Sequence, residues 1–284
     1  ATTLRDAGAA GRVFSRHRLR RALVAAQAAL SISLPVGAGL CIRSLNAAAT
    51  MTPGFQAEGV VVGWLDLFSA GYTADQGRDF YARALDRLRA IPGVESVLRG
   101  RRIPLGFMGG SFSDVTVEGH TITDDDPQGV ALNSVGPDYA ATMRIPIVRG
   151  RDLSPADTSR QPPVALITET MARIYWKDRD AVGGRFMFGG PRPDQEPQWI
   201  TVAGVVKDIK QRSLNERPSP MVMIPILQFY ASNAVVHVRT AAGLDVMTGQ
   251  LQRAMRELDP QVPFYNVSRL ADHTKAATFQ QKMA

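Results

Sequence analysis

The chain has 284 residues, 45% hydrophobic and 21% charged, which is enough for a membrane segment and a sizeable folded part. Of its 33 basic and 26 acidic side chains, six arginines and one aspartate lie in residues 1–21, which leaves 27 basic and 25 acidic side chains for the rest. The formal net charge of +7 is therefore concentrated at one end, which excludes a basic nucleic-acid-binding face on the folded part, and we expect no nucleic-acid partner.

Residues 22–43 are predicted to form a transmembrane helix. Residues 22–42 carry no charged side chain, and 21 helical residues span about 30 Å, the thickness of a bilayer's hydrocarbon core. The arginines before this stretch predict that residues 1–21 form a basic cytoplasmic segment and that the residues after Arg43 are extracytoplasmic.

Two other interpretations of this apolar stretch stay open. It can be a cleaved signal peptide, because Ala47, Ala48 and Ala49 offer small residues at a cleavage site. The stretch is long for that role, however, and Arg43 lies between it and the site. A buried helix of a soluble core is the other interpretation, although no polar face with a helical period is present.

Two β-α-β units are predicted at the two ends of the folded part. Each combines a strand rich in β-branched residues, a helix with one apolar face and a return strand. Pro92-Gly93 and Asp259-Pro260 end the two helices. The expected elements are the strand 60–67, helix 74–91 and strand 94–99, and then the strand 234–239, helix 244–258 and strand 263–267.

The middle of the chain, residues 104–228, has a different pattern and is predicted to be an inserted mixed α/β subdomain. Proline and glycine near residues 104–110 and 218–225 suggest hinges at its two ends. Short strands are expected at 112–118, 131–135, 145–148, 164–168 and 199–206, with helices near 137–143 and 169–176.

The sequence contains no motif that predicts catalysis. The glycine pairs are not followed by Lys-Ser or Lys-Thr, so no phosphate-binding loop is expected, and Cys41 is the single cysteine. The run Asp124-Asp125-Asp126 is interpreted as a solvated turn, because the ligand spacing of a calcium loop is missing. The four histidines are scattered, at His17, His120, His237 and His273, and His237 is interpreted as structural. We predict no catalytic, cofactor-binding or metal-binding residue, and no cofactor.

Several stretches, taken in order, resemble the MacB-like periplasmic core domain of permeases of the FtsX superfamily. They begin with the apolar helix and its arginines, RLRRALVAAQAALSISLPVGAGLCIRSL, and continue with NSVGPDYAATMRIPIVRGRD and PVALITETMARIYWKDRDAVGGRF. The other matching stretches are residues 81–97, 200–227 and 251–270. The resemblance implies an α+β periplasmic domain, with a porter-like subdomain at 55–103 and 229–272 and an inserted sabre-like subdomain at 104–228.

The resemblance also implies a function. The chain would be the periplasmic module of an ABC-type permease in the bacterial inner membrane, closest to the duplicated permeases that lack a fused ATPase. It would transmit ATP-driven motion across the membrane for export or extraction of a substrate, a role called mechanotransmission, and would not be an enzyme itself. Its expected partners are a separate cytoplasmic ABC ATPase, another permease half or protomer, a periplasmic adaptor and the lipid bilayer.

The chain departs from this family in carrying one predicted transmembrane helix where its modules have four. We therefore interpret it as a fragment, in which residues 273–284 lead into a further transmembrane helix. The alternative interpretation is a single-pass membrane-anchored periplasmic sensor or binding protein.

Overall fold

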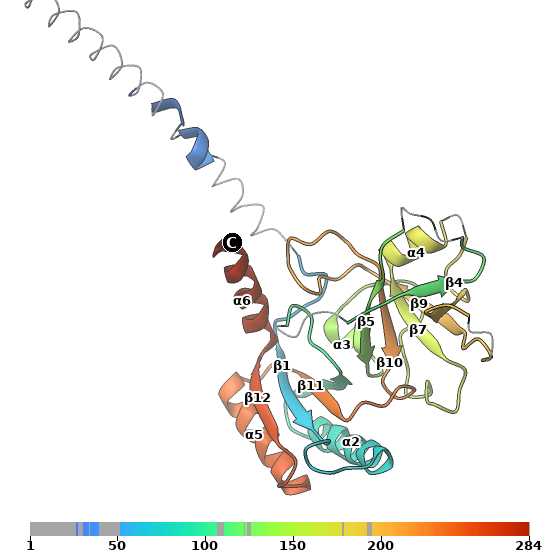
Figure 1. Cartoon of the computed structure of the whole chain (residues 1–284). Helices are drawn as coiled ribbons and strands as arrows, with labels where there is room; N and C mark the ends of the chain where they lie inside the picture. The colour runs from blue at the N-terminus through green and yellow to red at the C-terminus, as the bar shows by residue number, and fades with distance from the viewer. Residues whose placement is uncertain are drawn as a thin grey trace, which may run out of the picture. The chain divides into compact units, whose positions relative to one another are not determined.

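The computed structural model describes residues 27, 31–33, 35–39, 52–106, 111–121, 123, 126–177, 179–191 and 195–283, with side chains as far as residue 276. The chain forms two compact units, Ala1–Met51 and Thr52–Ala284, and the account below concerns the second (Figure 1).

The predicted membrane segment lies mostly outside the described residues. The structure does not describe the basic segment 1–21 or most of residues 22–43. The described residues of this stretch, 27, 31–33 and 35–39, are helical. Of the helices in the described part of the chain, none combines the length and the apolar composition needed to cross a bilayer. The transmembrane helix and the membrane lead-in at 273–284 therefore stay predictions.

Local sequence explains where the helix α2 (Ala74–Arg89) begins and ends. Thr73 caps it, because its hydroxyl accepts a hydrogen bond from the Gln76 amide while the Gln76 side chain accepts one from the Thr73 amide. Phe80 and Leu88 are fully buried on the face that packs against the sheet. The helix stops before Gly93, which adopts a φ of +86°.

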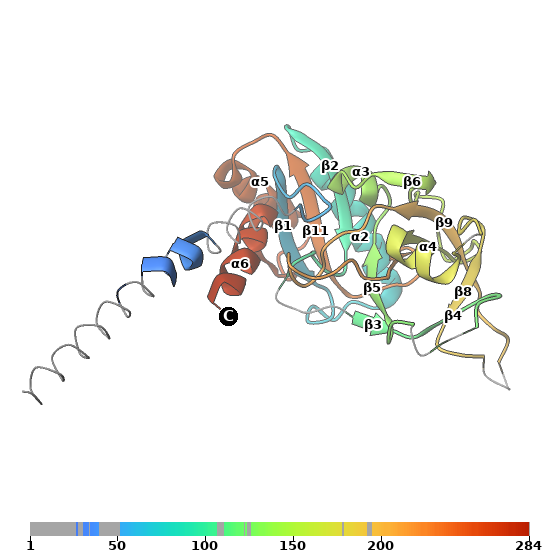
Figure 2. The ribbon, with the colours of Figure 1, turned by 90° about the horizontal axis from the view of Figure 1, so that it is seen from above.

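Four strands formed by the two ends of the folded part lie side by side in the order β12-β1-β11-β2. They are β1 (Val60–Asp66), β2 (Val94–Gly100), β11 (Asn233–Thr240) and β12 (Phe264–Arg269). Figure 1 labels β12, β1 and β11, and Figure 2 labels β2. Because β11 is antiparallel to both β1 and β2, these two strands run parallel with β11 between them. Each β-α-β unit is therefore split by a strand of the other unit, as in a ferredoxin-like sheet.

The sheet continues through the middle of the chain in the order β5-β10-β7-β9-β8-β4, with β3 beside β5 and β6 beside β9. These strands are β3 (Ser111–Ser113), β4 (Val115–Val117), β5 (Val130–Val135), β6 (Ile147–Gly150), β7 (Val164–Thr168), β8 (Arg185–Phe188), β9 (Ile200–Val206) and β10 (Met221–Pro225). The remaining helices are α3 (Tyr139–Met143), α4 (Glu169–Tyr175), α5 (Leu244–Leu258) and α6 (Leu270–Met283).

The prediction of a hinge at residues 218–225 is wrong. Met221–Pro225 form the fully buried strand β10, which is parallel to β5 and antiparallel to β7. The prolines misled the prediction because they lie before the strand, at Pro218 and Pro220, or at its last residue, where they remove no amide from the interior of the ladder. The strand β8 was also not predicted, and the expected strand 112–118 is interrupted at Asp114.

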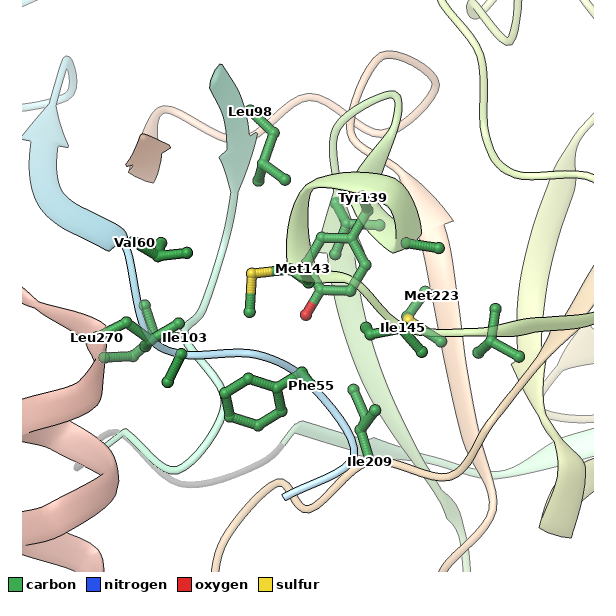
Figure 3. Close-up of a cluster of buried hydrophobic side chains, with 14 of the residues drawn as sticks. Phe55, Val60, Leu98, Ile103, Tyr139, Met143, Ile145, Ile209, Met223 and Leu270 are labelled. Carbon is green, nitrogen blue, oxygen red and sulfur yellow. The ribbon is translucent and has the colours of Figure 1, made fainter. Parts of the chain in front are cut away.

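The two faces of β11 pack into different hydrophobic cores. Ala234, Val236 and Val238 point towards α2 and α5 and belong to one core. Val235 on the opposite face belongs to a second core that draws residues from both predicted subdomains, with Val60 from one and Tyr139 and Met143 from the other. Figure 3 shows that in this second core the Met143 side chain lies between Val60 and Tyr139. The subdomain bounds stay a prediction, because this core is continuous across them.

Candidate functional site

The segment that enters the folded unit, residues 52–58, is held between two parts of the middle of the chain. The Lys210 amide donates to the Pro53 carbonyl at 2.8 Å, and the Gln56 amide donates to the Met143 carbonyl at 2.9 Å. Phe55 is buried between them (Figure 3). Gly54 has a φ of +83°, and an added Cβ would overlap the Asp208 carbonyl oxygen. The entering segment is therefore fixed to the loop after β9 and to the end of α3.

Arg239 on β11 connects this entering segment to the sheet and to α3. Its Nε donates to the Thr142 carbonyl at 2.6 Å, Nη1 to the Glu58 carbonyl at 2.9 Å and Nη2 to the Gln56 carbonyl at 2.9 Å. Arg239 is 5% exposed, and burial lowers its pKa, an effect to which Arg144 adds. One cation thus joins three segments that are far apart in sequence, and we call this arrangement the Arg239 clamp.

A second buried arginine, Arg99 on β2, fixes the connection between β10 and β11. Its guanidinium lies 4.1 Å from the centre of the Tyr81 ring and donates to the Ile226 carbonyl at 3.1 Å. Burial lowers the Arg99 pKa to about 10, so the side chain is still charged at neutral pH. The Tyr81 hydroxyl donates to the Ser232 carbonyl at 2.6 Å. Both ends of the 226–232 connection are therefore held close to α2.

The two halves of the sheet meet at a short seam between β2 and β5. Gly100 pairs with Val135, and the Arg101 amide donates to the Ser134 carbonyl at 2.8 Å. His237 lies beside this seam, because a Cβ added at Gly100 would be 3.2 Å from its Cε1 atom. The His237 side chain is fully buried, and burial lowers its pKa to about 4. It is neutral at pH 7.

The histidines singled out in the sequence do not come together. His120 pairs with Asp126 at 2.8 Å, and His273 shares a 2.8 Å hydrogen bond with the Ser268 hydroxyl. His17, Asp124 and Asp125 lie outside the described residues. Within the described ranges, no group of three or more His, Cys, Asp or Glu side chains is placed to hold a metal ion.

Sequence reasoning missed Arg99 and Arg239, the two residues on which this site depends. The sequence did contain an indication of these buried arginines. Side chains alternate between the two faces of a strand, and in the strands VESVLRG and NAVVHVRT this alternation places an arginine on a face that is buried. A buried arginine needs polar partners, and the chain supplies them as backbone carbonyls.

Residues 28–280 match the family model of the MacB-like periplasmic core domain. Among solved structures, the periplasmic region of MacB from Actinobacillus actinomycetemcomitans is similar with a TM-score of 0.52 and 14% identity, over 78% of this chain and 94% of that one. A domain of a permease protein from Porphyromonas gingivalis has a TM-score of 0.45 and 16% identity, over 76% and 92% of the two chains.

The extracellular domain of the noncanonic ABC-type transporter YknZ from Gram-positive bacteria has a TM-score of 0.44 and 14% identity, over 72% of this chain and all of that one. No curated protein sequence matches the chain.

Proposed function

Because the chain belongs to the family of MacB-like periplasmic core domains, we propose that it transmits ATP-driven motion across the inner membrane as the periplasmic module of an ABC-type permease. The matched family is that of periplasmic core domains, and the similar MacB structure is a periplasmic region, which supports the interpretation of this chain as the periplasmic domain of an ABC-type transporter permease that is not itself an enzyme. In the proposed function, a separate cytoplasmic ATPase supplies the energy, and the motion serves the export or extraction of a substrate.

The observation that carries this proposal is the Arg239 clamp. A movement of the chain at Thr52 reaches Gln56 and Glu58 within a few residues, and there it meets a guanidinium fixed on β11. The same guanidinium is bonded to Thr142 at the end of α3. Charge-assisted hydrogen bonds in a buried position resist displacement, so the movement is passed to the sheet and to the middle of the chain together.

The layout of the folded unit supports the proposed subdomains. A porter-like subdomain formed by residues 55–103 and 229–272 has its own helix-covered core, made by α2, α5 and one face of the four-strand sheet. A sabre-like subdomain formed by residues 104–228 has a core around α4. We propose that the Gly100–Val135 seam and the 226–232 connection are where the two subdomains change their relative position, and that a second permease half and a periplasmic adaptor complete the assembly.

A reversible disulfide tests the proposal in the full permease with its ATPase. Cys41 is first replaced by Ser, and Arg101→Cys is combined with Ser134→Cys, because these residues face each other across the seam, where the Arg101 amide donates to the Ser134 carbonyl at 2.8 Å. We expect the oxidised form to lose transport and to regain it on reduction, while a free-thiol assay confirms the bond. Transport that is unchanged by the closed disulfide would contradict the proposal.

The matched control joins Arg185 to Thr201, which face each other on the antiparallel strands β8 and β9. This pair lies within one proposed subdomain and leaves the seam free. The double cysteine variant at these two positions should transport equally well in the oxidised and reduced forms. Loss of transport in the control as well would mean that oxidation harms the permease generally. The disulfide between positions 101 and 134 and the control disulfide are therefore compared in one preparation.

A further inference from the structure

A second candidate site lies away from the Arg239 clamp, where β6, β9 and α4 approach one another (Figure 2). A surface hollow of about 420 Å³ opens between these elements and residues 177 and 179–181, which follow α4. Its volume lies within the range of small-molecule sites, about 300–1,000 Å³. Its wall includes the small apolar side chains of Val148, Ala172 and Val205, which can contact the carbon skeleton of a ligand.

Four cationic side chains from three separate parts of the fold line this hollow. Arg149 comes from β6, Arg173 from α4, and Lys177 and Arg179 from the segment after α4. We call the hollow with these four side chains the basic pocket. Arg173, Lys177 and Arg179 are close in sequence, whereas Arg149 belongs to a strand that the fold brings to them from an earlier part of the chain.

The carboxylates that line the basic pocket pair with one of its four cations, Arg149, and leave the other three without a carboxylate partner among the described residues. Asp180 is paired with Arg149 at 3.3 Å, and Glu169 is paired with Lys207, which is outside the lining, at 3.1 Å. Arg173, Lys177 and Arg179 form no ion pair with a carboxylate in the described part of the chain. The pocket therefore presents positive charge that an anion can still neutralise.

The guanidinium groups are held in place before any ligand binds. Arg173 donates from Nη2 to the Thr170 hydroxyl at 2.8 Å, and that hydroxyl in turn donates to Asp208 at 2.7 Å. Arg179 donates to the backbone carbonyls of Glu118 and Gly119. Side chains fixed in this way lose less conformational entropy on binding, and a guanidinium presents parallel donors that match two oxygens of one phosphate.

We propose that the basic pocket binds the phosphate group of a small anionic molecule. Phosphate suits it better than a carboxylate, because it offers more oxygens to several donors, and a phosphate monoester also carries close to two charges at neutral pH. The phosphate can belong to a soluble phosphate ester or to the headgroup of an anionic lipid, since the pocket would contact both through the same oxygens. This site is independent of the proposed mechanical function.

Lys177 allows a test that does not endanger the fold. It adopts a φ of +40°, a region that asparagine tolerates better than lysine does. Lys177→Asn therefore removes one pocket charge while keeping or improving stability. Arg173→Gln removes a second. Arg89→Gln is the charge-matched control, because Arg89 is exposed at the end of α2 and, among the residues that the structure describes, forms an ion pair only with Asp86, three residues earlier.

The experiment measures binding to the full chain in neutral detergent micelles by calorimetry and by thermal shift, at constant ionic strength. The soluble probes are pyrophosphate and glycerol 3-phosphate, the lipid probe is dihexanoyl phosphatidylglycerol, and dihexanoyl phosphatidylcholine and chloride are the reference compounds. We expect saturable binding of at least one phosphate probe to the wild type and to Arg89→Gln, weakened about tenfold or more by Lys177→Asn and by Arg173→Gln.

The outcomes separate the sources of phosphate. Binding of the soluble probes that depends on Lys177 supports a phosphate ester, and binding of phosphatidylglycerol alone that depends on Lys177 supports a lipid headgroup. An absence of saturable binding, or equal binding by Lys177→Asn and the wild type, would overturn the proposal. Binding of a poly-glutamate peptide in preference to every phosphate probe would also overturn it, because the surface would then be a docking site for an acidic protein segment.

Discussion

The Nε atom of Arg239 donates a 2.6 Å hydrogen bond to the carbonyl oxygen of Thr142, which lies 97 residues earlier in the chain. Thr142 is in the last turn of α3, where backbone carbonyls have no partner within the helix. The bond therefore satisfies a carbonyl that would otherwise be buried without a donor, and it does so from the middle of a sheet. The Arg239 side chain thus caps the carbonyl end of α3 and also joins β11 to the middle of the chain.

Replacing Arg239 by Met should destabilise the folded unit strongly. Met preserves much of the side-chain volume, but the carbonyls of Gln56, Glu58 and Thr142 lose their donor. Leaving the buried Thr142 carbonyl unsatisfied costs about 1–3 kcal/mol and the two part-buried carbonyls cost less, so we expect a loss of roughly 3 kcal/mol in the free energy of unfolding. Urea denaturation measures this loss. Arg89→Gln at an exposed ion pair should change it by less than about 0.5 kcal/mol, and an equally small effect of Arg239→Met would contradict the clamp.

Two helical glycines should respond to alanine with opposite signs. Gly77 in α2 faces the Tyr230 ring, and a Cβ added there would overlap the Tyr230 hydroxyl, so Gly77→Ala should destabilise by about 1–3 kcal/mol. Gly249 in α5 has no atom within 4 Å of such a Cβ, so Gly249→Ala should stabilise by about 0.5–1 kcal/mol through helix propensity.

Thermal or urea unfolding of the two glycine variants gives the comparison. The variant Gly77→Ala combined with Tyr230→Ala isolates the clash, because removal of the ring opens the space that the new methyl group needs. The cost of Gly77→Ala should be much smaller in the background of Tyr230→Ala than in the wild type. An equal cost in both backgrounds would show that the Tyr230 ring is not the reason for a glycine at this position.

His237 should make the stability of the folded unit depend on pH in the mildly acidic range. Burial lowers its pKa from 6.5 to about 4, so between these values the unfolded state binds a proton that the folded state does not. The free energy of unfolding therefore does not depend on the titration of His237 above pH 6.5. As the pH drops from 6.5 towards 4, protonation of the unfolded state lowers this free energy, by about 3 kcal/mol in total. Unfolding curves at several pH values from 7 to 4 measure this contribution.

The variant His237→Leu removes the titrating group while it keeps an apolar side chain between Val62 and Leu98. Its stability should fall less steeply with decreasing pH than that of the wild type, and the difference between the two proteins should grow as the pH approaches 4. Parallel pH profiles for both proteins would mean that the acid sensitivity arises from other groups, such as the carboxylate of Asp157, whose pKa is lowered by its hydrogen bonds to Arg151.

The sequence predicted the helices α2 and α5 closely because their signals are local. The cap formed by Thr73 and Gln76 and the breaker at Pro92-Gly93 lie within a few residues of the helix ends. The strand β10 was missed because its pairing with β5 and β7 is non-local and its proline-rich flanks are typical of a turn.

The Arg239 clamp could not be predicted in detail for a related reason. Its acceptors are backbone carbonyls, which every residue carries, so no residue type marks Gln56, Glu58 or Thr142 as partners. The inward position of Arg239 in an apolar strand was the available signal, and it indicates only that some polar partner exists. By contrast, the resemblance to the family depended on ordered stretches along the chain, which need no knowledge of contacts.

The proposed orientation places residues 1–21 in the cytoplasm and the folded unit outside it, and fusions to alkaline phosphatase test both parts. The enzyme is active only outside the cytoplasm, so a fusion after Arg12 should be inactive and a fusion after Asp124 active. The arginine excess before residue 22 is the cause. Replacing Arg12, Arg16 and Arg18 by Glu should therefore lower the activity at Asp124. An active Arg12 fusion would contradict this orientation. Cleavage near Ala47 would favour the signal-peptide interpretation, and the mass of the purified chain distinguishes it from a retained helix.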